Sequence, residues 1–454
     1  MQNQVYDVAV IGGGASGMMA AIAAKSRLPQ GRVLLLERND SPGRKLLATG
    51  NGRCNFTNVL TEDRDYGEAA EFVRPTLESL GPRKVMDLLE SMGIWPRVED
   101  GGRVYPYSGQ GAAVNQALQR RMEQLGVEVH CGAEVAETVF GAEFHLVLKG
   151  GERVFCRRLI LATGGKAGGQ YGCRGDGYQF ARQLGHSVEK VRPALVAVNC
   201  TNWDKAWKGV RAQAAVSLWR TALKESEEPR CVAEDLGEVQ FTDAGLSGIC
   251  VFNLSRSITY TGNMKEGRNE AYEIRVDFLP EETEEQVGEL LKHRREWLRG
   301  QTADALRSSV VHDRLVEGLL RRVELAPLTI VCDGESSLVW PEAEDVTDRQ
   351  IRGLAALLKG WRFAVEGTKG WNDAQVTAGG VCRNQVDSVT MESLVQSGLY
   401  LCGEVLDVDG RCGGYNLQWA FASGWTAGLN AAAAVTAEAA HGELRKEKRN
   451  ASHS

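Results

Sequence analysis

In the segment Tyr6-Asp-Val-Ala-Val-Ile-Gly-Gly-Gly-Ala-Ser-Gly17, an apolar strand runs directly into a glycine-rich turn. In the spacing G-x-G-x-x-G, Gly12 permits a tight turn, Gly14 lets the backbone approach a pyrophosphate, and Gly17 lets the next helix pack on the strand. A second apolar strand, Arg32-Val-Leu-Leu-Leu-Glu37, ends in a carboxylate twenty residues after Gly17, where it can accept hydrogen bonds from a ribose diol. The combination predicts a Rossmann-like α/β domain that binds a dinucleotide, and it leaves open which one.

The bulk properties are those of an ordinary globular protein. The 454 residues are too many for one core, so two or three domains are expected. The net charge of −6 offers no general attraction to nucleic acid or to an anionic membrane. No apolar stretch approaches the roughly 20 residues of a membrane span, so no membrane contact is expected.

The cysteine pattern favours a reducing compartment. Eleven cysteines are scattered without a Cys-x-x-Cys pair. No signal peptide precedes the first strand, so we expect a cytoplasmic protein with free thiols. The seven histidines are dispersed, and no metal site is expected.

The first part of the chain has the element order of flavoproteins of the glutathione-reductase type. An antiparallel meander precedes an apolar strand that ends in Ala162-Thr-Gly-Gly165. The expected strands are 5–11, 32–37, 127–135, 143–149, 153–156 and 159–161, and the expected helices include 82–93 and 111–125.

The middle of the chain, from about 191 to 375, differs in texture and holds seven of the ten tryptophans. We interpret it as a β domain interrupted by a helical one, an insertion that covers the cofactor and shapes the substrate site. Strands are expected at 194–200, 213–219, 229–233, 272–278 and 328–332, and amphipathic helices at 282–299 and 302–323.

The first domain then resumes. Gly398–Glu404 reads as a strand that ends in Gly-Glu, and Gly413–Gln418 opens a helix that runs to about Val435. The charged tail beyond it is expected to be disordered. No second strand–GxGxxG–helix unit occurs, so a separate nicotinamide domain is not expected. If NAD(P)H is the electron donor, it would visit the cofactor transiently or share the substrate pocket in a ping-pong reaction.

Four segments carry a more specific resemblance: Gly43–Asn58, Ala162–Tyr178, Gly237–Gly248 and Thr377–Gln418. In them the chain resembles the BaiN/RdsA family of NAD(P)/FAD-dependent oxidoreductases, often called aminoacetone oxidase-like. Many relatives have proline where this chain has Ile249. The resemblance implies a Rossmann-like FAD domain of the glutathione-reductase type (1–190 and 376–454), a β-barrel-like domain (191–280 and 324–375) and a small helical domain (281–323).

The resemblance also implies how FAD is held. The glycine turn would bind the pyrophosphate, Glu37 the adenosine ribose, and the Val135 backbone the adenine. Gly403 and Glu404 would lie near the ribityl chain. Asn416 and Leu417 begin the last helix, whose positive end can stabilise negative charge at flavin N1/O2. The full predicted FAD-binding set is Gly12, Gly14, Ala15, Ser16, Gly17, Glu37, Arg38, Lys45, Gly50, Asn51, Arg53, Cys54, Asn55, Val135, Thr163, Gly164, Gly403, Glu404, Asn416 and Leu417.

The sequence identifies the catalytic residues less closely than the FAD-binding residues. Tyr415 is the preferred proton donor because of its position at the flavin helix, with Tyr105, Tyr107, Tyr171 and Tyr178 as alternatives. Two further pairs lie in the flavin-proximal loops. Cys54 and Cys412 could form a redox relay, but loop packing is favoured. Arg53 and Arg411 could face a cofactor phosphate or a substrate carbonyl, or lie on a solvated surface.

The family's activities reduce a C=C bond conjugated to a carbonyl. The acidic charge favours a small hydrophobic substrate such as a 3-oxo bile acid or steroid, with NAD(P)H as the donor. The alternative is a dihydrouridine synthase acting on 23S ribosomal RNA, the one case with a nucleic-acid partner. A flavin amine oxidase and a non-catalytic flavin-binding interaction protein are further alternatives.

Overall fold

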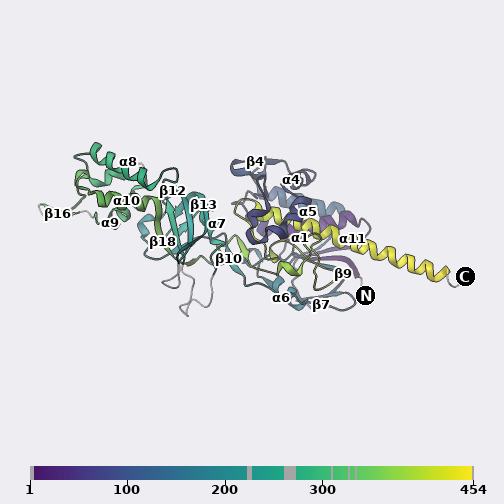
Figure 1. Ribbon diagram of the computed structural model, residues 1–454. Helices are drawn as coiled ribbons and strands as arrows, with labels where there is room; N and C mark the ends of the chain where they lie inside the picture. The colour runs from purple at the N-terminus through teal and green to yellow at the C-terminus, as the bar shows by residue number, and fades with distance from the viewer. Residues whose placement is uncertain are drawn as a thin grey trace. The chain divides into compact units, whose positions relative to one another are not determined.

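The computed structural model describes residues 5–221, 228–259, 272–307, 310–325, 328–332 and 335–451, without the side chains of 307, 328–332, 335–338 and 441–451. The chain forms two compact units (Figure 1). Unit 1 comprises Met1–Pro193 and Trp371–Ser454, and unit 2 comprises Ala194–Gly370. Each is considered by itself below.

The core of unit 1 is a sheet with five parallel strands in the order β6-β2-β1-β9-β20. The central strands are apolar and almost fully buried, as expected for parallel strands covered on both faces. Because the strands are parallel, their carboxyl ends lie at one edge of the sheet, where ligands bind in such folds. The strands are β1 (Val5–Ile11), β2 (Val33–Leu36), β6 (Glu128–His130), β9 (Arg153–Leu161) and β20 (Leu399–Leu401).

Strand β9 joins two parts of the sheet. Its first half pairs with the meander strand β8 (Phe144–Leu148), which pairs with β7 (Val135–Phe140), and its second half pairs with β20. The prediction of separate strands at 153–156 and 159–161 is therefore wrong, because β1 pairs along nearly the whole of β9 and keeps it extended. The expected strand 127–135 is likewise divided between β6 and β7.

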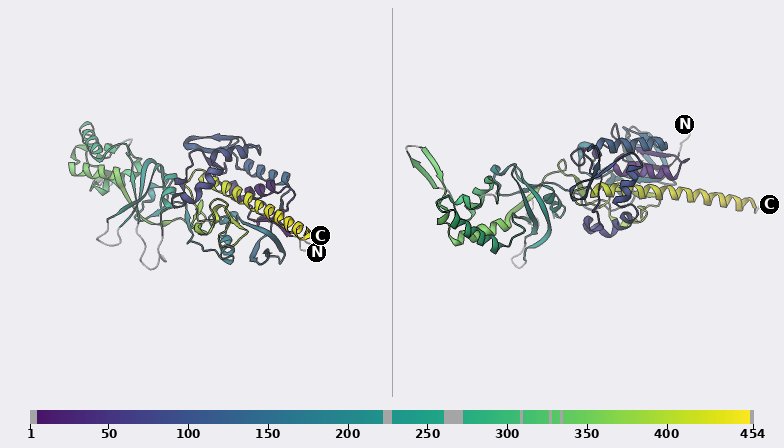
Figure 2. Two further views of the ribbon diagram at one scale, coloured as in Figure 1. Left: turned by 45° about the vertical axis from the view of Figure 1, so that its right-hand side comes forward. Right: turned by 90° about the horizontal axis from the view of Figure 1, so that it is seen from above.

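Helices α1 (Ala15–Arg27) and α11 (Tyr415–Ala451) pack with their backbones in close contact. A Cβ added to Gly424 would lie 2.2 Å from the Ser16 carbonyl oxygen, and one added to Gly428 would lie 2.2 Å from that of Ala20. Helix α11 continues through Ala451 and extends beyond the sheet (Figure 2). The prediction of a disordered tail is thus wrong up to Ala451, since its Glu, Lys, Arg and Ala residues are strong helix formers.

The remaining elements of unit 1 surround this framework. Helix α5 packs against α1 and α2, and β3, β4 and β5 form a small antiparallel sheet. Short β10, at the unit boundary, pairs with β19. The bounds are α2 (Arg44–Ala48), β3 (Thr57–Asn58), α3 (Ala70–Ser79), α4 (Pro82–Glu90), β4 (Pro96–Val98), β5 (Arg103–Pro106), α5 (Gly111–Leu125), α6 (Asp176–Gln183), β10 (Arg192–Ala194) and β19 (Val376–Ala378).

Unit 2 contains a closed barrel with the strand order β11-β14-β13-β12-β15-β18. The interior is aromatic: Trp207 packs edge-on against Trp361 at 5.1 Å between ring centroids, and Phe363 lies 5.0 Å from Trp361. The strands are β11 (Val198–Cys200), β12 (Arg211–Arg220), β13 (Arg230–Phe241), β14 (Gly245–Ser247), β15 (Tyr272–Asp277) and β18 (Trp361–Thr368).

Helices cover part of this barrel. The single helix expected at 302–323 is wrong: a 3-10 turn (Ala303–Arg307) precedes α9, which begins after His312, whose ring accepts a hydrogen bond from the Arg314 N–H. Ile249 occupies the first position of α7, where proline is also well tolerated, so this departure from the relatives leaves the turn intact. The other elements are α7 (Ile249–Ser255), α8 (Glu284–Trp297), α9 (Asp313–Arg322), α10 (Asp348–Gly360) and the hairpin of β16 (Leu328–Cys332) and β17 (Glu335–Val339).

Candidate functional site

The glycine turn after β1 forms an open cradle at the carboxyl edge of the sheet. Gly12 has a φ of +105°, and a Cβ there would lie 2.5 Å from the Ala162 carbonyl oxygen. A Cβ on Gly17 would lie 1.8 Å from the Gly12 carbonyl oxygen. At Gly14, by contrast, no atom lies within 4 Å of an added Cβ. Two glycines are therefore required by packing, and the third borders free space of the kind that a pyrophosphate would fill.

Glu37 follows β2 and closes one side of this cradle. Its buried carboxylate accepts hydrogen bonds from the Gly13 N–H at 2.7 Å and from the Asn39 N–H at 2.8 Å. The loop after β6 borders it, since Ala133 donates its N–H to the Glu37 carbonyl oxygen at 2.9 Å. The Asn39 side-chain amide also donates to the Glu37 carboxylate at 2.7 Å, so of the about four acceptor sites of a carboxylate one remains for the ribose diol. Val135, predicted to contact adenine, begins β7 two residues beyond Ala133.

Helices α1 and α11 run parallel, because Gly424 lies against Ser16 and Gly428 against Ala20, so their N-termini face the same side of unit 1. Helix α1 begins after Gly14, and neither α1 nor α11 has an acidic residue in its first turn. A Cβ on Gly403 would lie 2.5 Å from Ser16 Oγ, so the loop after β20 lies against the start of α1. The free N–H groups and positive ends of such helices favour anions.

The start of α11 is shaped by its own side chains. Asn416 accepts a hydrogen bond from the Gly410 N–H at 2.8 Å and donates to the Gly410 and Arg411 carbonyl oxygens, which holds the preceding loop in place. Gly414, with a φ of +106°, lies so close to β3 that a Cβ would be 2.4 Å from the Thr57 carbonyl oxygen. Leu417 is partly buried against the core.

Lys45 and Glu404, separated by most of the chain, form an ion pair of 2.6 Å. Burial by itself would lower the pKa of Lys45, but the attraction of Glu404 outweighs it and raises that pKa above its ordinary value. Glu404 also accepts the Thr377 N–H at 2.8 Å. Thr377 Oγ1 in turn accepts the N–H groups of Lys166 and Ala167 at 2.8 and 3.0 Å. This network joins α2 to strand β19 and to the loops after β9 and β20.

Tyr178 on α6 is buried beside this network. No hydrogen bond of normal geometry reaches its hydroxyl oxygen among the described residues. Burial, followed by the nearby negative charge of Glu404, raises the pKa of this phenol, so the hydroxyl is protonated at neutral pH. Thr163, in the strand-end motif, lies close by, because a Cβ on Gly177 would be 1.9 Å from Thr163 Oγ1. Gly164, which follows it, has a φ of +69°.

The loop after α2 follows a tight path through left-handed conformations. Gly50, Asn51 and Cys54 have φ values of +57°, +55° and +58°. Asn55 accepts the Val104 N–H at 3.2 Å, which fixes the loop to β5. Cys54 is fully buried, and burial raises the pKa of its thiol to about 12. Cys54 and Cys412 are both free thiols, and Cys412 Sγ lies 3.6 Å from Gln375 Oε1.

The predicted arginines already have partners within unit 1. Arg38 pairs with Asp176 at the start of α6. Arg53 pairs with Glu99 and stacks over the ring of Tyr105 at 4.0 Å. Arg411 also makes an interaction, and it borders the loop that Asn416 holds.

Tyr415, the predicted proton donor, is the first residue of α11 and is buried. Its carbonyl oxygen accepts the Tyr66 hydroxyl at 2.8 Å. Of the alternatives, Tyr107 is exposed, and Tyr105 is mostly buried beneath Arg53. Tyr171 lies in a 3-10 turn, and its carbonyl oxygen accepts the Asn39 amide.

The structure also assigns roles that the sequence interpretation missed. Gly13 supplies an N–H to Glu37, and Thr377 organises the Lys45–Glu404 network, although both lie in quoted motifs. Gly424 and Gly428 allow α1 and α11 to touch, and their Gly-x-x-x-Gly spacing was the available signal. Among the described residues, no cluster of three His, Cys, Asp or Glu side chains has the arrangement of a metal site. No helix in that part of the chain is long and apolar enough to cross a membrane.

Known proteins align with nearly the whole chain. The 3-dehydro-bile acid delta(4,6)-reductase of Clostridium scindens is 37% identical over 94% of this chain and 98% of its own length. The ribosomal RNA dihydrouridine synthase of Escherichia coli is 30% identical over 92% and 96%. That of Haemophilus influenzae is 28% identical over 94% and 99%. The family described as "HI0933-like protein Rossmann domain" matches residues 6–430. The resemblance to the BaiN/RdsA family and the expected Rossmann-like fold with an inserted barrel are thereby confirmed, and this chain belongs to the HI0933-like family.

Proposed function

We propose that this protein is an FAD-dependent oxidoreductase that uses NAD(P)H to reduce a C=C bond conjugated to a carbonyl. The observation that carries the FAD assignment is the free space at Gly14, next to Glu37 and to the start of α1. The reductase activity named for the relative at 37% identity supports the reaction. We also propose that the protein is cytoplasmic and that residues 281–323 form a small helical domain within the insertion.

Different residues of the chain would bind the different parts of FAD. The Gly12–Gly17 turn and the first N–H groups of α1 would bind the pyrophosphate, and Glu37 would accept a ribose hydroxyl. Lys45 and Glu404 would border the ribityl chain, and the start of α11 would face the ring edge that gains negative charge. When bound, FAD would supply the hydride acceptor and donor of the reaction.

The protein's own chemical task is to deliver a proton. Reduction of an enone adds a hydride to the β-carbon and a proton to the resulting enolate, which must be stabilised while it forms. Tyr415 is our first candidate for this donor because of its place at the start of α11. Tyr178 is the second, because its buried hydroxyl is protonated at neutral pH and makes no hydrogen bond of normal geometry among the described residues.

We favour a small hydrophobic substrate such as a 3-oxo bile acid or steroid. The bile-acid reductase has the higher identity, 37% against 30% and 28% for the two RNA enzymes. The net charge of −6 also points away from a large anionic partner. The second candidate function, dihydrouridine synthesis in ribosomal RNA, is supported by the names of the other two relatives.

Turnover with two competing acceptors tests this proposal. NADH or NADPH is added anaerobically to the FAD-loaded protein, and the loss of flavin absorbance is followed. We expect bleaching, and recovery of absorbance when an unsaturated 3-oxo steroid is added. Recovery with a ribosomal RNA fragment alone would select the second candidate function. A flavin that neither nicotinamide reduces would contradict both. The variants Tyr415→Phe and Tyr178→Phe then identify the proton donor. Removing the hydroxyl of the true donor should slow the recovery of flavin absorbance by the steroid and leave bleaching by the nicotinamide unchanged.

A further inference from the structure

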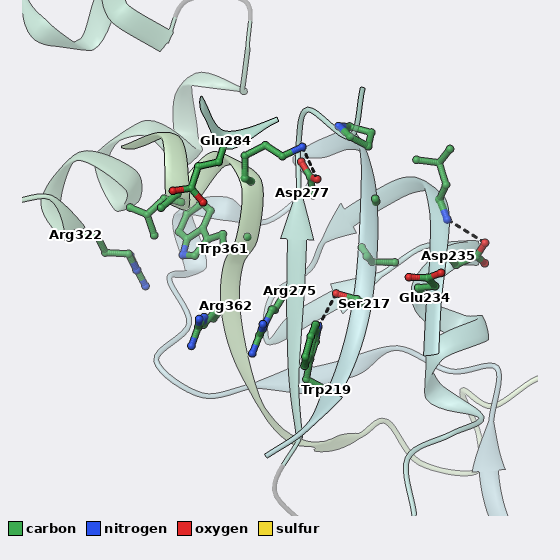
Figure 3. Close-up of a pocket in the computed structure, with 18 of the residues that line it drawn as sticks. Ser217, Trp219, Glu234, Asp235, Arg275, Asp277, Glu284, Arg322, Trp361 and Arg362 are labelled. Carbon is green, nitrogen blue, oxygen red and sulfur yellow. Dashed lines mark hydrogen bonds and ion pairs between the residues drawn. The ribbon is translucent and has the colours of Figure 1, made fainter. Parts of the chain in front are cut away.

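A large cavity lies on the outer face of the barrel, wholly within unit 2. Its volume is about 1080 Å³, and strands β12, β15 and β18 with helix α10 contribute to its walls (Figure 3). Ser217, Arg275 and Arg362 lie on outward positions of these strands, because they alternate with buried neighbours such as Ile274 and Phe363. Ligand sites commonly span roughly 300–1,000 Å³, so this one has room for more than a single ion.

Two arginines face each other across the floor of this cavity. Arg275 on β15 and Arg362 on β18 are register partners in the antiparallel ladder, and Figure 3 shows their side chains next to each other. Directly opposed residues have Cβ atoms only about 5 Å apart, and like charges in that position are destabilising. Arg275 pairs with Glu273 at 2.6 Å and stacks over Trp219 at 3.7 Å. Arg362 makes no ion pair or hydrogen bond among the described residues. The opposed pair therefore lacks one counter-charge.

A third guanidinium, that of Arg322, lies toward the same end of the cavity (Figure 3). It donates to the Gly318 carbonyl oxygen at 2.8 Å and lies 5.0 Å above the centre of the Trp361 ring. No carboxylate pairs with it in the described part of the chain. Three guanidinium groups against the carboxylates of Glu273 and of Glu284, which lies beside Trp361 (Figure 3), leave this end positively charged.

Three of the cavity's carboxylates are engaged or lie at its far side, and Glu284 lies beside Trp361 (Figure 3). Asp277 pairs with Lys359 at 2.7 Å. Asp235 accepts the Asn253 amide at 2.6 Å, and it lies with Glu234 at the far side of the cavity (Figure 3). Glu284 is the first residue of α8, where the helix dipole stabilises its charge. None of these four is paired with the arginines.

We propose that this cavity binds a phosphate-bearing ligand of nucleotide size, whose phosphate oxygens contact Arg275, Arg362 and Arg322. A phosphate carries up to two negative charges and several acceptor oxygens, so it can contact more than one of these guanidinium groups at once, which a single carboxylate does less well. Guanidinium forks bind phosphate oxygens bidentately. Ser217 lies next to Arg275 in the cross-strand row, and its oxygen already accepts the Trp219 indole N–H at 2.8 Å. Its own hydroxyl hydrogen can therefore be donated to the same phosphate.

Calorimetric titration of the FAD-loaded protein with ADP, inorganic pyrophosphate and inorganic phosphate tests this site. FAD loading fills the Gly12–Gly17 cradle, so that ADP reports on the second site. We expect ADP and pyrophosphate to bind more tightly than phosphate, and Arg362→Gln to weaken ADP binding about tenfold or more, the usual effect of losing a hydrogen bond to a charged group. The control Arg349→Gln removes one exposed positive charge from α10 and should change affinity by less than about twofold.

Thermal unfolding distinguishes a loss of ligand binding from a loss of folded stability in the variant. Without ligand, Arg362→Gln should unfold at the same temperature as the wild type or higher, because it relieves the repulsion from Arg275. With ADP, the wild type should gain stability and the variant should not. Equal ADP affinity in wild type and R362Q would overturn the proposal, as would equal losses in R362Q and R349Q. Binding of a ribosomal RNA fragment that ADP does not displace would assign the arginines to nucleic acid instead.

Discussion

Replacing Gly14 with alanine separates cofactor binding from folding. The backbone at Gly14 has φ −75° and ψ −172°, which alanine adopts without strain, and its Cβ would meet no protein atom within 4 Å. The unliganded variant should therefore be as stable as the wild type, or more stable by about 0.4–1 kcal/mol, because alanine restricts the unfolded chain. The methyl group would instead occupy the space proposed for the pyrophosphate. Losing one hydrogen bond to a charged group costs about 1.5–3 kcal/mol. At about 1.4 kcal/mol per tenfold, FAD should bind roughly 10- to 100-fold more weakly.

Two glycines provide controls for this experiment. A Cβ on Gly141, in the exposed β7–β8 turn, also meets no atom within 4 Å, so Gly141→Ala should leave FAD affinity unchanged. Gly17→Ala would place a Cβ 1.8 Å from the Gly12 carbonyl oxygen and should prevent stable folding. FAD affinity is measured by fluorescence titration of the unliganded protein, and stability by urea unfolding. If Gly14→Ala binds FAD as tightly as Gly141→Ala, the cradle is wrongly assigned.

Three other perturbations follow from contacts in the two units. Gly424→Ala should destabilise the protein by about 1–3 kcal/mol through overpacking against Ser16. The control Gly288→Ala, on α8, would place a Cβ no closer than 4.0 Å to its nearest neighbour, Ala355 Cβ, and should be neutral or stabilising in urea unfolding. The raised pKa of Lys45 contributes stability that is complete below about pH 10 and is lost as the pH rises through the folded-state pKa. The stability difference between wild type and Lys45→Met should therefore shrink in alkaline solution, and a constant difference would contradict this. Because its pKa is about 12, Cys54 should resist alkylation in the native protein while exposed Cys131 reacts, as peptide mass mapping would reveal.

The parts that the sequence predicts well are those governed by local rules. Gly12, Gly17 and Glu37 are fixed by the geometry of one strand, one turn and the next strand, and the structure places them as expected. Helix α5 coincides with the predicted range 111–125 for the same reason, since its apolar positions recur with the helical period. Local pattern also identified most strands of the insertion.

The features of the structure that the sequence predicts poorly depend on contacts between residues far apart in the chain. β9 is one strand because β1 supports it along almost its whole length, which periodicity at 153–161 does not encode. Lys45 and Glu404 meet only because α2 and the end of β20 reach the same edge of the sheet. Arg53 was expected to face a cofactor phosphate or a substrate carbonyl, or to lie on a solvated surface; its pairing with Glu99, which depends on the packing of a separate small sheet, was not predicted. The opposed arginines Arg275 and Arg362 become neighbours only when the barrel closes.

The most direct test of the central claim is a single anaerobic turnover with product analysis. The FAD-loaded protein is reduced by NADPH, freed of excess nicotinamide, and mixed with an unsaturated 3-oxo steroid. We predict reoxidation of the flavin together with one equivalent of a steroid product that has gained two hydrogen atoms across the conjugated C=C bond. A flavin that stays reduced with the steroid, and is reoxidised only by ribosomal RNA or by oxygen, would contradict the account.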